Sequence, residues 1–243
     1  GDEKFLEERG FGQALLTRSH AILRELDDVR RSITNLAGAI SGELSLATSH
    51  HIGLHRLPGP LKQFHDRYPA VRLDLHFMDS EKACRAVAQG EIELAIVTLP
   101  PVVDAPLQTI EVWHDPLDIV VSPTHPLAGT TPASPKALLD YPAILPGAGT
   151  YTREIILKAL GPWRDKITVG MATNYLEVLK MLAAIGLGWS ALPRTMIDES
   201  LTVVQIGKMK LERHLGIVTH AARTLSNAAQ AMIDARQGDE VAT

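Results

Sequence analysis

The chain has 243 residues, of which 45% are hydrophobic, enough to build a core in one large or two small domains. Its formal net charge is -4 at pH 7 with histidine neutral, so bulk charge gives it no means of holding DNA or an anionic membrane. Cys84 is the single cysteine, which excludes an internal disulfide framework. No apolar run approaches a membrane span or a secretory signal, so we expect a cytoplasmic protein without a membrane partner.

The first segment, residues 4–41, contains no strand-like pattern. Its apolar side chains recur at alternating spacings of three and four, which is a heptad seam, and charged residues fill the other positions. This pattern predicts a long dimerising helix over residues 1–41 that ends at Ser41-Gly42. One amphipathic helix packed on its own domain is the alternative, because periods of 3.5 and 3.6 differ little over four heptads. The seam consists of Leu15, Ser19, Ile22, Leu26, Val29, Ile33, Leu36 and Ile40.

Strand and helix patterns then alternate up to residue 97. Tyr68-Pro69 and Gln89-Gly90 break the helices where strands must begin. Two consecutive βαβ units imply a parallel sheet. The predicted strands are 44–48, 71–77 and 92–97, and the predicted helices are 52–67 and 80–89.

A second α/β series of similar size follows the break at Pro100-Pro101. A terminal helix over residues 225–236 is expected to return and cover the first unit. The predicted strands are 107–113, 117–121, 143–145, 167–171, 188–192, 201–206 and 215–219, and the predicted helices are 135–139, 151–160 and 175–185.

The stretch from residue 44 to residue 58 holds a corner at which a strand runs straight into a helix start. The apolar strand stops at Thr48, Ser49, His50 and His51. A serine or threonine there can cap the first helical turn, and free N–H groups and the positive end of the helix dipole point outward. Such a corner attracts a small anion.

Several short motifs, spread over almost the whole chain, match one protein family in order and in spacing. The chain resembles the linker helix and effector-binding region of LysR-type transcriptional regulators. The motifs are Leu6-Glu7-Glu8-Arg9-Gly10, Gly42-Glu43-Leu44-Ser45-Leu46-Ala47-Thr48, Leu57-Pro58 with Phe64 and Tyr68-Pro69, residues 87–98, His125-Pro126-Leu127-Ala128, and residues 184–193.

The resemblance implies a periplasmic-binding-protein-like fold, in which two α/β subdomains are joined by two crossover strands and hold an effector in the cleft between them. It places the linker or dimerisation helix at 1–41, regulatory subdomain I at 42–102 and 208–243, and regulatory subdomain II at 103–207. The family also carries an N-terminal winged helix-turn-helix domain that reads DNA. We expect that domain to be missing here, so that DNA is a partner only through it, and we expect a homodimer or homotetramer.

In such a fold the ligand lies outside the carboxyl ends of the strands. Hydroxyls and free amides dominate these ends, and they suit a small oxyanion or carboxylate. In sulfur-assimilation members of the family, positions like Ser49, His51, Thr98 and Thr150 surround a sulfur oxyanion, and a protonated His51 would add positive charge and make binding pH-sensitive. The candidate effector-binding residues are Thr48, Ser49, His50, His51, Thr98, Gly147, Gly149, Thr150, Tyr151, Thr173 and Asn174.

Each candidate has a simpler structural interpretation. Thr48 and Ser49 could be helix caps without a ligand, and Gly147 and Gly149 could serve only a tight turn. His51 and His55 lie four residues apart and could share a metal, but no third ligand accompanies them in the sequence, so we expect no metal site.

Cys84 is expected to be a small buried apolar residue of the helix 80–89 rather than a redox switch, because the chain has no resolving cysteine.

The sequence therefore predicts the effector-sensing domain of a LysR-type regulator, with a small anionic effector such as sulfate or sulfite. The alternative is a solute-binding protein of a transport system, which would share the two-lobed fold but would not begin with a long heptad helix. The chain has no nucleophile elbow, Walker loop, dinucleotide fingerprint or paired cysteines, so we expect neither an enzyme nor a cofactor.

Overall fold

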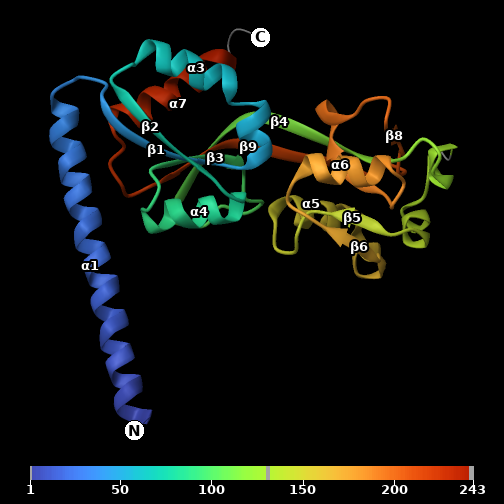
Figure 1. Ribbon diagram of the computed structural model, residues 1–243, viewed down its shortest axis with the longest axis horizontal. Helices are drawn as coiled ribbons and strands as arrows, with labels where there is room; N and C mark the ends of the chain where they lie inside the picture. Colours follow the sequence, from blue (N-terminus) through green and yellow to red (C-terminus); the bar gives the residue numbers. More distant parts are fainter. Residues whose placement is uncertain (1, 130–131, 241–243) are drawn as a thin grey trace.

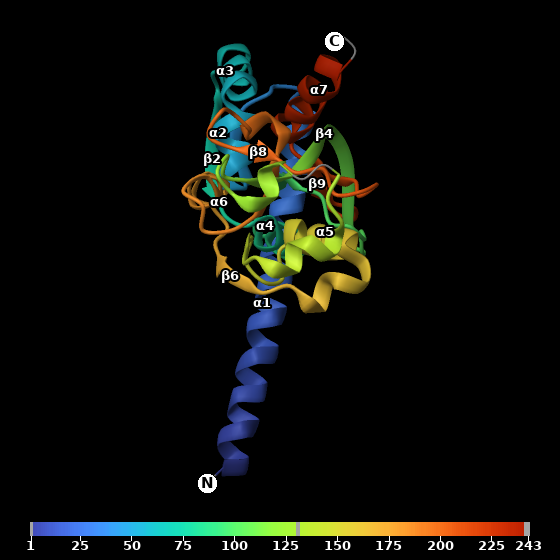
Figure 2. The same ribbon diagram turned by 90° about the vertical axis from the view of Figure 1, so that its right-hand side faces the viewer.

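The structure, a computed structural model, describes residues 2–129 and 132–240. Two α/β lobes lie side by side and are joined by two long strands, and helix α1 (Asp2–Leu36) projects from the edge of the first lobe (Figure 1). The N-terminal half of this helix extends well beyond both lobes (Figure 2). The predicted fold class, two α/β subdomains joined by two crossover strands and preceded by a long helix, is confirmed.

The first lobe, called lobe I below, is built on a parallel arrangement of three strands. Strand β1 lies between β2 and β3 and runs parallel to both, as the two βαβ units predict. Its buried side chains Leu44 and Leu46 pack in one core with Ala229 and Met232 of the terminal helix, which covers this lobe as predicted. The elements of lobe I are β1 (Gly42–Thr48), α2 (His50–His55), α3 (Pro58–Arg67), β2 (Val71–Phe77), α4 (Ser80–Gln89), β3 (Leu94–Thr98) and α7 (Asn227–Glu240).

The two crossover strands are β4 (Leu107–Val121) and β9 (Leu211–His220), which pair antiparallel over residues 107–117 of β4 and the whole of β9. Val112 and Ile217 belong to the core of lobe I, whereas Leu117 and Leu211 belong to the core of the other lobe. The prediction of separate strands at 107–113 and 117–121 is wrong. Pro116, which cannot donate a hydrogen bond, stays inside one continuous strand opposite Glu212.

The second lobe, called lobe II, holds a short parallel pair, β5 with β6, next to β7 and β8, which pair antiparallel with β4. Trp189 is fully buried in its core and donates its indole N–H to the Leu138 carbonyl at 3.1 Å. The elements of lobe II are β5 (Ala143–Leu145), α5 (Tyr151–Leu160), β6 (Val169–Ala172), α6 (Leu176–Ala184), β7 (Ser190–Pro193) and β8 (Thr202–Val203), with 3-10 turns at Pro126–Gly129, Pro135–Asp140, Gly161–Lys166 and Arg194–Met196.

Two helix predictions need correction. The helix expected over residues 52–67 is two helices, α2 and α3, because Pro58 and Pro60 supply no N–H for continuous helical hydrogen bonding. Helix α1 ends at Leu36 rather than at residue 41, since Gly38 adopts a left-handed φ of 71°, and Ile40 beyond it packs against the core of lobe I. The subdomain boundaries at 41/42, 102/103 and 207/208 stay predictions.

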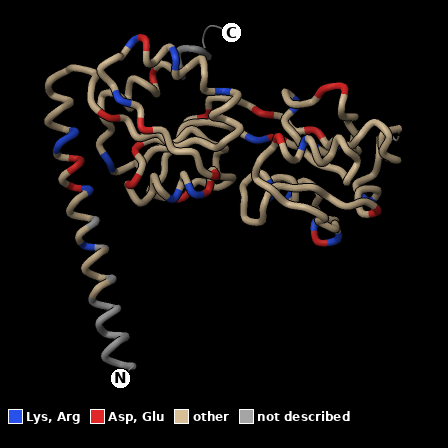
Figure 3. The backbone as a smooth tube through the Cα atoms, viewed as in Figure 1, with Lys and Arg blue, Asp and Glu red and all other residues tan. Residues whose placement is uncertain are grey.

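One face of α1 docks on lobe I through polar contacts. Arg24 donates to the Gln89 carbonyl at 2.7 Å, and Asn35 accepts from the backbone N–H of Asn227 at 2.9 Å. Arg223, which precedes α7, donates to Asp28 at 3.2 Å. Basic residues flank a short acidic run along the part of α1 nearest this lobe (Figure 3). These polar contacts hold the C-terminal half of the helix against lobe I.

The apolar residues of the predicted seam that lie in α1 are exposed on another face of the helix, whereas Ile40 packs on lobe I. The exposed fractions of these α1 side chains run from 48% at Val29 to 88% at Leu36, with 62% at Ile22. Since burying a side chain of this kind releases about 1.5 to 3 kcal/mol, such a row needs a covering partner. We propose that a second copy of the chain covers it, as the heptad spacing predicts. Among the described residues, no helix is both long and apolar enough to cross a membrane.

Introducing charge into this seam should separate the copies. We expect Ile22→Glu together with Val29→Glu to convert the oligomer to a lower-order species, because two desolvated carboxylates would face their counterparts across the seam. Light scattering coupled to size-exclusion chromatography measures the molar mass directly. Ala14→Glu places one carboxylate on an exposed position off the seam and should leave the mass unchanged. An unaltered mass for the double variant would refute pairing through α1.

Candidate functional site

A cleft of about 300 Å³ lies where the ends of β1 and β3 face the start of α5. Its walls come from both lobes, and Arg213 of the crossover strand β9 contributes to it. The turns that follow β1 and β5 thus share one hollow. Lobe I supplies Ser49, His50, His51, Phe77, Met78, Asp79, Ser80, Glu81 and Thr98, and lobe II supplies Pro146, Thr150, Thr152, Asn174, Tyr175 and Leu176.

The structure brings six of the eleven predicted effector-binding residues to this cleft. That they contact an effector stays a prediction. These six are Ser49, His50, His51, Thr98, Thr150 and Asn174.

The other five predicted residues do not line the cleft. Thr48 is buried, and its hydroxyl donates to the Ile96 carbonyl at 2.8 Å. Thr173 accepts through its hydroxyl from the Tyr175 N–H, and Gly149 serves a turn with φ of 81°. Gly147 donates its N–H to Asn174 Oδ1 at 2.7 Å, and a Cβ at Gly147 would lie the same distance from that oxygen. Tyr151 packs its ring against the buried cluster that contains Cys84.

The Thr150 hydroxyl caps a helix, whereas the Ser49 hydroxyl does not. Thr150 caps α5, since its Oγ1 accepts from the Arg153 N–H at 3.3 Å and donates to the Gly147 carbonyl at 2.9 Å. Ser49 occupies the N-cap position of α2 but makes no capping hydrogen bond with its side chain. Helix α2 has only six residues, so its dipole is weak, and the Ser49 hydroxyl is the more available of the two.

His51 differs from the expectation of a positively charged ligand. Its side chain is buried, and burial lowers its pKa to about 4, assisted by the charges of Arg213 and His55. The imidazole is therefore neutral at pH 7 and adds no positive charge to the cleft.

Two acidic side chains of lobe I reach across the cleft. Glu81 accepts a hydrogen bond from the backbone N–H of Tyr151 at the start of α5, and Asp79 accepts from the amide of Asn174 at 2.9 Å. Sequence reasoning named neither Glu81 nor Asp79 as a cleft residue. Both follow the predicted strand 71–77, so the rule that located the other strand ends would have found them.

A charged network adjoins the cleft and reaches it through Arg213 and Thr152. Asp115 accepts from Arg213 Nη2 at 2.6 Å and from Arg56 Nη2 at 3.2 Å, and Arg213 also donates to the Thr152 hydroxyl at 3.2 Å. Asp115 is 1% exposed and Arg213 is 3% exposed. Sequence reasoning missed both residues, because each strand carries other charged side chains, such as Glu111 and Glu212, and no local pattern marks the buried pair among them.

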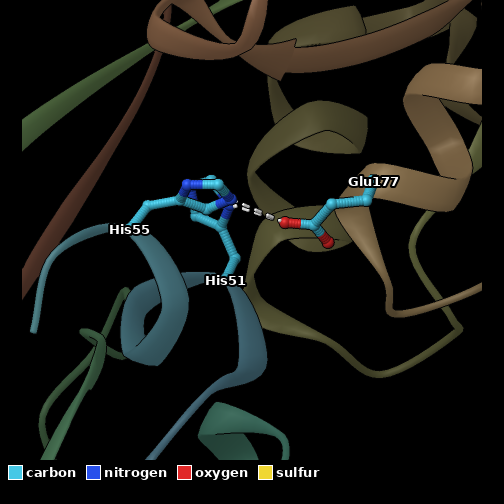
Figure 4. Close-up of side chains that lie close together, drawn as sticks. All are labelled: His51, His55 and Glu177. Carbon is cyan, nitrogen blue, oxygen red and sulfur yellow. Dashed lines mark hydrogen bonds and ion pairs between the residues drawn. The ribbon is translucent and has the colours of Figure 1, made fainter. Parts of the chain in front are cut away.

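Glu177 of α6 is the third member of a group that includes His51 and His55. Its Oε1 lies 2.9 Å from His55 Nε2 and 3.5 Å from His51 Nδ1 (Figure 4). Burial alone would raise the pKa of Glu177, but its own backbone N–H and the two histidines outweigh burial and lower the pKa. The sequence-based premise that the two histidines lack a third partner is therefore wrong. The partner, Glu177, comes from the other lobe and lies 122 residues from His55 along the chain.

Cys84 lies in α4 and is 2% exposed, within an apolar cluster of lobe I. Burial raises the pKa of its thiol. Its placement is that of a small buried apolar residue, as predicted.

The fold and the cleft define a class, a two-lobed effector-binding domain of the periplasmic-binding-protein type. Residues 37–238 match the model of the LysR substrate binding domain, so the chain belongs to the LysR family, whose members are transcriptional regulators and not enzymes. Among curated relatives, the transcriptional activator CmpR of Synechocystis is 27% identical over 228 residues, which cover 92% of this chain and 74% of that protein.

Solved structures agree with this assignment at the level of the fold. The regulatory domain of CcmR from Synechocystis PCC6803 in complex with 2-PG superposes with a TM-score of 0.72 at 24% identity, covering 82% of this chain and 97% of that domain. A sulfate-bound mutant of the OxyR2 regulatory domain from Vibrio vulnificus gives a TM-score of 0.69 at 21% identity, covering 82% of this chain and 97% of that domain.

Removing the acid of the buried network should destabilise the whole domain. We expect Asp115→Asn to lower the free energy of unfolding by about 3 to 5 kcal/mol, because two buried or half-buried guanidinium groups lose their counter-charge. Urea denaturation followed by circular dichroism measures the change. Asp118→Asn, on the same strand, breaks the more exposed pair with Arg194 and should cost far less. Equal losses in the two variants would contradict the role given to Asp115.

Proposed function

We propose that the cleft between the lobes binds a small anionic effector, and that its occupancy controls DNA binding and transcription through a DNA-reading domain outside this chain. The observation that carries the proposal is the meeting of neutral hydrogen-bond donors from both lobes in one cleft. Ser49 and Thr98 line it from lobe I, and Asn174 lines it from lobe II. Neutral donors can saturate the oxygens of an anion without burying a second unpaired charge.

The size of the cleft supports a small effector. About 300 Å³ lies at the lower end of the range for small-molecule sites, which runs from roughly 300 to 1,000 Å³. A sulfur oxyanion such as sulfate or sulfite is the candidate we favour, because Ser49, His51, Thr98 and Thr150 all line this cleft. The sulfate-bound OxyR2 domain has the same fold, and the neutral His51 can donate one ring N–H to an anion.

Two carboxylates of lobe I compete with an anionic effector for its hydrogen-bond donors. Glu81 already fills the anion-binding position at the start of α5, and Asp79 already holds the Asn174 amide. An incoming oxyanion must therefore displace at least one of these carboxylates. In the absence of effector, the same two contacts hold the lobes together.

The effector acts on the regulator by changing the relative arrangement of the lobes. A ligand shifts this equilibrium only to the extent that it binds one arrangement more tightly than the other. Exchange of internal carboxylates for an effector supplies such a difference, because it replaces contacts that bridge the lobes. A transport solute-binding protein would share the cleft, but membership of the LysR family and the long helix favour the regulator.

A ligand screen combined with paired variants tests the cleft. Thermal-shift measurements against sulfate, sulfite, thiosulfate, O-acetylserine and aromatic carboxylates should identify a ligand that raises the melting temperature, since a ligand specific for the folded state stabilises it. With that ligand, Ser49→Ala combined with Thr98→Val should lose about 1 to 3 kcal/mol of binding free energy by calorimetry. Thr109→Val removes a hydroxyl from a strand outside the cleft and serves as the control. Unchanged affinity in the Ser49→Ala, Thr98→Val variant would contradict binding of the ligand in this cleft.

Neutralising Glu81 should act in the opposite direction. We expect Glu81→Gln to bind the same anion more tightly than the parent chain, because the competing carboxylate and its repulsion are gone while the side-chain size is kept. Calorimetry in low salt gives the comparison with the parent. A weaker or equal affinity would contradict the proposed displacement of Glu81.

Effector binding should also change the shape of the domain in solution. Small-angle scattering of the chain with and without saturating effector should differ, because the two lobes change their relative angle. Superimposable profiles would contradict a mechanism that depends on lobe movement.

A further inference from the structure

Three metal-binding side chains converge in a hollow next to the effector cleft. His51 and His55 project from α2 of lobe I, and Glu177 projects toward them from α6 of lobe II (Figure 4). Their candidate ligand atoms all lie within 4.8 Å of one another. The two histidines are four residues apart on a helix, so their rings share a face, with centroids 4.7 Å apart.

Buried polar atoms of His51 and Glu177 lack hydrogen-bond partners among the described residues. His51 is 5% exposed, and neither of its ring nitrogens has a hydrogen bond of good geometry among the described residues, since Nδ1 comes only within 3.5 Å of Glu177 Oε1. Glu177 Oε2 is also buried without a partner among those residues. Buried polar groups in native proteins are almost always satisfied, and each orphan costs about 1 to 3 kcal/mol. Three such atoms in one group indicate a ligand that the protein chain does not itself supply.

Two imidazoles and one carboxylate form the ligand set that divalent ions of intermediate softness prefer, Zn²⁺ above all, with a fourth position left for water. We propose that His51, His55 and Glu177 bind one such ion and that the ion joins lobe I to lobe II. An ion about 2 Å from each ligand atom keeps these atoms within about 4 Å of one another. Rotation of the exposed His55 and the partly exposed Glu177 side chains would bring the three ligand atoms to this separation.

The cationic side chains next to this site contact other carboxylates and do not use Glu177. Arg213 and Arg56 both contact Asp115, and Lys180 contacts Asp198. Glu177 is thus the carboxylate that remains for the two histidines within the described part of the chain. Hard ions such as Mg²⁺ and Ca²⁺, which prefer oxygen ligands, fit this group poorly.

The site would couple to the effector cleft through a shared residue. His51 lines the effector cleft and also lines the neighbouring hollow that contains His55 and Glu177. A bound ion would fix the His51 ring and hold the lobes in the arrangement in which α2 faces α6. The metal would then act as a second input to the sensor, separate from the anion.

Zinc titration of the untagged chain tests the site, with matched variants. Equilibrium dialysis should give one Zn²⁺ per chain, and Co²⁺ should give the visible absorption bands of a four-coordinate site. His55→Ala and Glu177→Ala should each weaken Zn²⁺ binding by more than about tenfold, at least the loss produced by removing an outer-shell partner. The control is His114→Ala with His214→Ala, which removes another histidine pair that contacts Glu212 and Glu111 on the crossover strands.

The pattern of Zn²⁺ binding among the variants decides the proposal. Loss of Zn²⁺ in the two site variants, with the control unchanged, supports the site. Absence of binding in the parent chain, equal binding in all variants, or loss only in the control overturns it. Because anion affinity is measured without added metal, failure here leaves the proposed function intact, and failure of anion binding leaves the metal result intact.

Discussion

The buried contact between Asp115 and Arg213 is the constraint on which the two-lobed arrangement depends. These residues are directly opposite each other on β4 and β9, at the point where both strands pass from one hydrophobic core to the other. Arg56 reaches the same carboxylate from lobe I, and Thr152 of α5 accepts from Arg213 on the side of lobe II. A desolvated charge that loses its partner is costly, so these four side chains must keep their places in any arrangement that the lobes adopt. We therefore expect the lobes to rotate about this network while its contacts stay intact.

Two carboxylates of lobe I bridge the cleft above this network, and they resemble the anions that the cleft is proposed to bind. Glu81 and Asp79 contact donors at the start of α5 and at Asn174, where an oxyanion would otherwise lie. Effector binding is then an exchange of one set of hydrogen bonds for another, and only the difference between the two sets contributes to affinity. A sensor built in this way responds to concentrations well above those that a preformed empty site would detect, and its response depends on the charge of the competing side chains.

Sequence reasoning succeeded where the signal was local and failed where it depended on distant partners. The βαβ periodicity predicted the parallel strands β1, β2 and β3. Helix α5 begins as predicted because Thr150 supplies a real N-cap, and it ends as predicted at Gly161. The predicted strands omit residues 114–116, although a crossover strand tolerates Pro116 where no donor is needed. The rule for strand ends placed Ser49 and Thr98 at the cleft, but nothing local to His55 reveals that Glu177 lies 2.9 Å away. The burial of His51, which makes it neutral, likewise depends on packing that no sequence pattern encodes.

The attachment of α1 has a mechanical consequence. Its polar face is fastened to lobe I at Gln89, Arg223 and Asn227, while lobe II lies on the far side of lobe I from the helix (Figure 1). A rotation of lobe I about the crossover strands is therefore transmitted rigidly to the helix, which works as a lever arm. A few degrees of turn at the root of such an arm become a displacement of several ångströms at its tip, because the 35 residues of α1 extend for about 50 Å.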